Sequence, residues 1–193
     1  MASNGVMVKA VIVLSGVLVL GASAGWAQPA TPVAKLDLNQ LTGAWYEIAH
    51  LPVKSEKHCV ADGRLLYALG DKPGRFQMVS SCRMKDGYID VRNSNGRVAD
   101  KSGDGRLKVS TLWLLSRKYW VLALGPENGW ALVGTPNHKS MWILSRTEMK
   151  PETLNEVKAK ASSEGYDLDK LIVVPGWHGT PLTPEIPVKS SND

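Results

Sequence analysis

The chain has 193 residues and a formal net charge of +5, and its 23 basic residues are scattered along the sequence. A mild, scattered positive charge mainly favours solubility, so a nucleic-acid partner is not expected. The length is enough for one domain of ordinary size.

The N-terminus is typical of a secretory signal peptide. A positive charge at Lys9 precedes a short apolar run over residues 10–20, and small residues follow. The run is shorter than the ~20 apolar residues that span a bilayer, which argues against the alternative of a retained anchor. We expect residues 1–27 to be removed, with cleavage after Ala24 or Ala27. The mature chain would then be exported to the periplasm or secreted, either free or peripheral to the outer membrane.

Short runs of strand character follow, separated by turn sequences. Asn-Gly and Asp-Gly pairs supply the positive φ that tight hairpins require. Eight strands are predicted, at residues 44–50, 61–69, 75–83, 88–99, 106–113, 118–124, 130–135 and 141–146. A bulge is expected at Asn95-Gly96, because glycine inside a strand often marks one. Eight short strands predict an antiparallel sandwich or a closed barrel, and periodicity alone does not choose between them.

One helix of about 14 residues is predicted after the eighth strand. Pro151 suits its first position, apolar residues follow at spacings of three and four, and Gly165 suits the position beyond its end. A short apolar strand over residues 171–174 comes next. The folded domain is therefore placed at residues 28–176, and a Pro- and Ser-rich tail over residues 177–193 is expected to lack fixed structure.

Three motifs resemble those of lipocalins. Gly43-Ala-Trp45 is similar to the G-x-W signature of the first lipocalin strand, and residues 118–124 fall at a second signature region, although they lack its common Thr-Asp-Tyr wording. Residues 141–147, Met-Trp-Ile-Leu-Ser-Arg-Thr, resemble the last strand of bacterial outer-membrane lipocalins and their apolipoprotein-D-like relatives. The resemblance covers residues 36–176. It implies an all-β fold, an eight-stranded antiparallel up-and-down barrel with one C-terminal α-helix packed outside.

The resemblance also implies roles for single residues. Trp45, two residues after Gly43, would plug the closed end of the barrel, and Arg146 would lie across it in a structural cation–π contact. The ligand would be a small hydrophobic or amphiphilic molecule such as a fatty acid or lysophospholipid, and a homodimer is suggested. Many bacterial relatives carry a lipid-modified N-terminal cysteine; no cysteine lies near this cleavage region, so no lipid anchor is expected.

The two cysteines, Cys59 and Cys82, both lie in the mature part. Export would place them in an oxidising compartment, where a pair usually forms a disulfide, and two free thiols are the alternative. Relatives with a cysteine pair in these regions form the disulfide, which is therefore expected here. A metal site is not expected, because no CxxC or HxxxH spacing is present and His58 would point away from Cys59 on a strand. No cofactor is expected either.

The ligand site is expected at the open end of the barrel, as a mostly apolar pocket with a few polar groups at its rim. Tyr119 and Trp142 are the candidates for its wall, since each offers a large apolar body with one polar handle. Strand alternation would place Val121 beside Tyr119 and Leu144 beside Trp142. The alternative is that Trp142 faces outward and packs under the helix.

Two residues of the first strand complete the candidate site. If Trp45 points into the barrel, alternation puts Glu47 and Ala49 on the same inward side. A carboxylate in the lumen is either part of a buried ion pair or a polar handle for a ligand, because a buried charge needs a partner.

Binding, storage or transport of the ligand, in support of envelope maintenance, is the leading function. An enzyme is not expected, because the chain has no G-x-S-x-G motif and its four histidines (His50, His58, His138 and His178) fall in or beside predicted loops or the tail. A lipocalin-like enzyme remains one alternative. The other is a protein-interaction barrel whose lumen is filled by side chains, because seven tryptophans could close a small barrel.

Overall fold

The computed structural model describes residues 29–99, 102–112, 115–175 and 188–190. The predicted signal peptide and both cleavage sites lie outside the described residues, as does most of the predicted tail.

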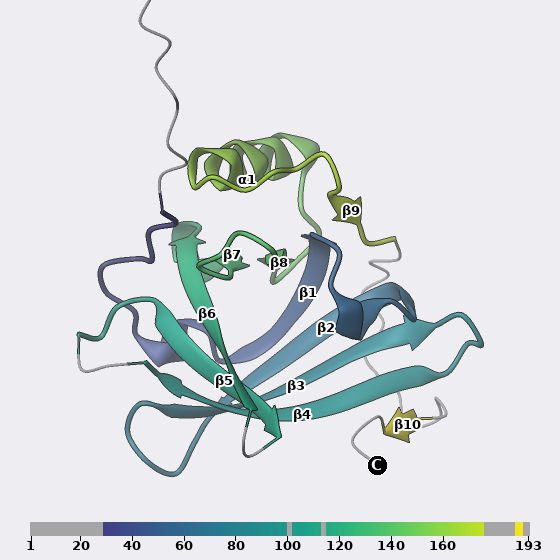
Figure 1. Ribbon diagram of the computed structural model, residues 1–193, viewed down its shortest axis with the longest axis horizontal. Coiled ribbons are helices and arrows are strands. Elements are labelled where there is room, and N and C mark those ends of the chain that lie inside the picture. The colour runs from purple at the N-terminus through teal and green to yellow at the C-terminus, as the bar shows by residue number, and fades with distance from the viewer. Residues whose placement is uncertain (1–28, 100–101, 113–114, 176–187, 191–193) are drawn as a thin grey trace, which may run out of the picture.

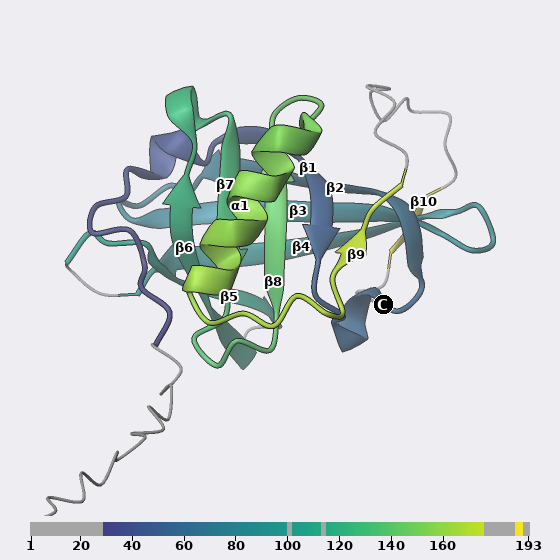
Figure 2. The ribbon, with the colours of Figure 1, turned by 90° about the horizontal axis from the view of Figure 1, so that it is seen from above.

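Eight antiparallel strands close into a barrel (Figures 1 and 2). They are β1 (Gly43–His50), β2 (Cys59–Leu69), β3 (Arg75–Met84), β4 (Ile89–Val98), β5 (Arg106–Leu112), β6 (Leu115–Leu124), β7 (Trp130–Gly134) and β8 (Met141–Ser145). Each strand pairs with the next in the chain, and β8 pairs back with β1. This closed up-and-down order excludes the sandwich and confirms the predicted fold class.

Helix α1 (Pro151–Ser163) lies outside the barrel, across β7 and β8 (Figure 2). Its residues Val157 and Ala161 are buried in one core cluster with Leu132 of β7 and Ile143 of β8. The helix therefore explains why these strands carry apolar residues on both faces. Gly165 has a φ of 87°, the left-handed conformation expected just beyond the helix end.

A plug of packed and hydrogen-bonded groups closes one end of the barrel. The guanidinium carbon of Arg146 lies 3.7 Å from the ring centroid of Trp45. Arg146 donates hydrogen bonds of 2.9 and 3.0 Å to the carbonyl oxygens of Ala44 and Gln40. The last of these belongs to the short 3-10 helix η1 (Leu38–Gln40), which precedes β1 at the plugged end. The other end of the barrel is open.

The predicted bulge at Asn95-Gly96 is wrong. The register between β3 and β4 runs through both residues without a shift. Gly96 has a different reason to be glycine, because a Cβ there would lie 2.1 Å from the ring of Phe76 on the neighbouring strand. The glycine lets an aromatic ring pack against the backbone.

Two further strands join the barrel after α1. Strand β9 (Ile172–Val173) pairs with β1, within the short strand predicted at residues 171–174. Strand β10 (Val188–Ser190), which falls within the predicted tail, pairs in parallel with residues 89–91 of β4. It lies on a free edge, because β5 pairs only with residues 95–98 of β4 and leaves the first half of β4 open on that side.

Candidate ligand cavity

The barrel encloses a cavity of about 650 Å³. Its deeper walls are apolar and come from five strands and the segment before β1: Leu41, Tyr67, Leu107, Val109, Val121, Val133 and Leu144. Its mouth lies opposite the Trp45–Arg146 plug, where Leu115 at the start of β6 is 68% exposed. The cavity is therefore a blind pocket that is entered from one end.

An aromatic pair lies in the wall of the cavity. The rings of Tyr119 and Trp142 contact each other, with centroids 5.4 Å apart and planes tilted by 50°. Val121 and Leu144, the expected neighbours on these two strands, also line the cavity. Trp142 donates a 3.3 Å hydrogen bond from Nε1 to the carboxylate of Glu56. It therefore does not face outward under the helix.

The expected inward position of Ala49 is wrong. The pairing of β1 with β8 shifts register between Glu47 and Ala49, so one residue of β1 is left over and the alternation of faces is reversed. Ala49 is fully buried in the outer cluster with Val157 of α1. His50 lines the cavity in its place, beside Glu47.

Glu47, His50 and Glu56 form a polar cluster in the cavity wall, which we call the Glu–His–Glu cluster. His50 Nδ1 lies 3.3 Å from Glu47 Oε1 and 3.1 Å from Glu56 Oε2. Burial and the nearby charge of Glu56 raise the pKa of Glu47 to about 7, and His50 offsets part of this rise. Burial alone would lower the pKa of His50, but the hydrogen bond to Glu56 and the two carboxylate charges outweigh it and hold that pKa above its usual value.

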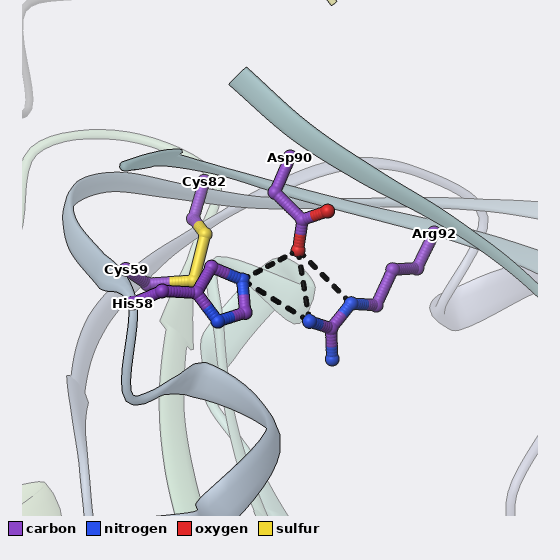
Figure 3. A network of polar contacts seen from close by, with 5 residues as sticks. All are labelled: His58, Cys59, Cys82, Asp90 and Arg92. Carbon is purple, nitrogen blue, oxygen red and sulfur yellow. Dashed lines mark hydrogen bonds and ion pairs between the residues drawn. A yellow bond between two sulfur atoms is a disulfide. The ribbon is translucent and has the colours of Figure 1, made fainter. Parts of the chain in front are cut away.

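A second polar network surrounds the disulfide (Figure 3). Cys59 of β2 and Cys82 of β3 are bonded to each other, as predicted, with their Cα atoms 5.6 Å apart. The buried carboxylate of Asp90 lies 2.8 Å from His58 Nε2 and accepts a 3.0 Å hydrogen bond from Arg92 Nε. The side chains of Asp90 and Arg92 face the cavity, so this wall is more polar than the sequence predicted.

Sequence reasoning missed His50, Glu56, Asp90 and Arg92. His50 ends the first strand, as the sequence predicts, but its side chain is buried and faces the cavity rather than the adjoining loop. The register shift that turns it inward has no signature in the spacing of apolar residues. Glu56 lies in the 3-10 helix η2 (Lys54–Glu56). No local sequence pattern indicates that this helix brings Glu56 to the cavity.

Comparisons with known proteins place the chain in a family. Residues 36–176 match the model of the lipocalin-like domain. Temperature-induced lipocalin-1 of Arabidopsis thaliana is 33% identical over 153 residues, which are 74% of this chain and 81% of that protein. Outer membrane lipoprotein Blc of Vibrio cholerae is 28% identical, over 86% of this chain and 98% of its own length. The chain belongs to the lipocalin family.

Solved structures agree on the fold. Insecticyanin from the tobacco hornworm Manduca sexta superposes with a TM-score of 0.64 at 21% identity, over 86% of this chain and 93% of insecticyanin. Lipocalins generally bind or transport small hydrophobic ligands and are generally not enzymes. Within the described residues, no helix has both the length and the apolar character needed to cross a membrane.

Proposed function

We propose that this lipocalin binds and carries an amphiphile with an acyl chain, such as a fatty acid or a lysophospholipid. The supporting observation is the blind cavity itself. Its volume of about 650 Å³ lies within the range of roughly 300–1,000 Å³ typical of small-molecule sites. The acyl chain would occupy the apolar floor around Leu107 and Val121, and the polar end would lie nearer the mouth, beside Glu56 and Arg92.

The cavity and its lining also argue against the two alternative functions, a filled protein-interaction barrel and an enzyme. A lumen filled by side chains would leave no space of this size, so the protein-interaction barrel is disfavoured. For an enzyme, the two cysteines that line the cavity are joined to each other. Neither offers the free thiol that nucleophilic catalysis by cysteine requires. Binding without catalysis is the simpler function for this site.

The proposed place of action is the periplasm or the outside of the cell, where the protein would support envelope maintenance. The disulfide supports export, because such bonds persist in oxidising compartments. The relative from Vibrio cholerae is named an outer membrane lipoprotein, which agrees with an envelope location. The homodimer suggested by family resemblance stays a prediction.

Titration of the protein with a fluorescent fatty acid tests this function. Wild type is expected to bind it at micromolar concentrations and to transfer energy to it from tryptophan. Trp142→Ala and Tyr119→Ala should each weaken binding ~5- to 30-fold, because each removes about 1–2 kcal/mol of aromatic contact in the wall. Leu66→Ala, at a half-exposed position of β2 that does not line the cavity, is the matched control and should bind like wild type. If wild type binds neither fatty acid nor lysophospholipid, the proposed function is wrong.

A further inference from the structure

We propose that the Glu–His–Glu cluster is a binding site for a divalent transition-metal ion of the zinc type. Its donors would be the Glu47 and Glu56 carboxylates and the Nδ1 atom of His50. This site lies in the wall of the same cavity as the proposed lipid site, but it needs no lipid to form. The sequence predicted no metal, because the three residues come together only in the folded barrel.

The donor geometry fits a small metal ion. Zinc binds imidazole nitrogen and carboxylate oxygen at ~2.0–2.2 Å in a tetrahedral arrangement, which puts neighbouring donors about 3.3–3.6 Å apart. The two distances from His50 Nδ1 are 3.3 Å to Glu47 and 3.1 Å to Glu56, and all three donor atoms lie within 4.8 Å of one another. One ion could therefore replace the proton between them with little movement of the side chains.

The negative charge of the cluster also favours the binding of a cation. Within the described part of the chain, the ion pairs of both carboxylates are made with His50. The side chains of Glu47, His50 and Glu56 are only 12%, 11% and 26% exposed, so water screens them weakly. With both carboxylates ionised, a protonated His50 leaves one negative charge over, whereas a divalent ion with neutral His50 balances the cluster. Buried charges are normally paired or bound to metal ions.

The surrounding fold holds the donors in place. The register shift in β1 brings Glu47 and His50, three residues apart, to the same face; a regular strand would put them on opposite faces. Gly63 of β2 makes room for Glu47, because a Cβ at that position would lie 2.7 Å from Glu47 Oε2. Trp142 Nε1 donates a hydrogen bond to Glu56 Oε2, the same oxygen that faces His50 Nδ1. Hydrogen-bonded partners of this kind orient ligands in protein metal sites.

The site has an open coordination position. All three donor residues line the cavity, so water or an oxygen of a bound molecule could supply the fourth ligand. A mixed set of one histidine and two carboxylates suits zinc or cobalt better than copper(I), which prefers sulfur.

Metal titration of the untagged, chelator-treated protein tests the proposal. Zinc competition against a chromophoric chelator near neutral pH should show one ion per chain. Glu47→Gln and Glu56→Gln should each weaken binding at least about tenfold. His58→Gln, which alters the histidine paired with Asp90 beside the disulfide, is the matched control and should leave zinc binding unchanged.

Cobalt(II) supplies a second readout, because visible absorption bands report nitrogen and oxygen ligands around the ion. These bands should appear with wild type and be lost in Glu56→Gln, whose change lies in the short helix η2 outside the barrel strands. Circular dichroism checks that each variant is folded. The proposal is overturned if wild type shows no saturable one-to-one binding, or if both carboxylate variants bind zinc like wild type.

Discussion

At the scale of single residues, the closed end of the barrel depends on Arg146. Its guanidinium lies over the Trp45 ring and donates to two backbone carbonyl oxygens of different segments. A planar group with several fixed donors can make these contacts together, whereas the compact ammonium group of lysine cannot.

Arg146→Lys is therefore expected to lower the free energy of unfolding by ~1–3 kcal/mol, although the charge is kept. Denaturant unfolding followed by tryptophan fluorescence measures this change. Arg97→Lys, at an exposed position of β4, is a control that should change stability by less than ~0.5 kcal/mol. Equal effects of the two substitutions would show that the plug geometry does not matter.

At the scale of elements, α1 is joined to the start of the described chain by Glu164 at its end. This carboxylate accepts hydrogen bonds of 2.6 Å from the backbone N–H of Thr31 and from Lys160. Burial alone would raise the pKa of Glu164, but these bonds and nearby positive charge outweigh it and lower the pKa below its usual value. The charged form therefore stabilises the folded state.

The stability contributed by Glu164 depends on pH. Because the folded-state pKa of Glu164 is lowered, its contribution is present above the usual glutamate pKa and is lost as the pH falls through the folded value. Glu164→Gln should therefore destabilise the protein by ~1–3 kcal/mol at pH 7 and by much less near pH 3. Thermal unfolding at both pH values measures the difference, with the exposed Glu156→Gln on the same helix as control. A loss of stability that is the same at both pH values would contradict the role of the charge.

Features with local sequence signals could be predicted, whereas features that depend on pairing between distant strands could not. The eight strands, the helix and its ends follow from glycine turns, alternation and Pro151, because these signals are local. The register shift after Glu47 has no local signal: it arises where β1 pairs with β8, a strand almost 100 residues away in the chain. The cavity is lined by the residues whose faces follow regular alternation: Glu47, Tyr119, Val121, Trp142 and Leu144. Ala49 follows the register shift, so its side chain points to the other face.

At the scale of the whole molecule, the barrel has one plugged end, one open end and a single cross-link near the mouth. The disulfide joins the first residue of β2 to β3, in the same wall as the His58–Asp90 pair. It therefore holds β2 against β3 at the open end of the barrel.

Removal of this cross-link is expected to destabilise the molecule without opening the closed end. The bond spans 23 positions of sequence, and a loop of that size contributes ~3 kcal/mol in the chain-entropy model. The double variant Cys59→Ala/Cys82→Ala should therefore unfold at a temperature ~6–12 °C lower than wild type. Calorimetry measures the shift, and wild type in reductant should approach the variant, whereas the variant itself should not respond to reductant. A variant as stable as wild type would mean that the paired strands β2 and β3 already restrict the chain as much as the bond does.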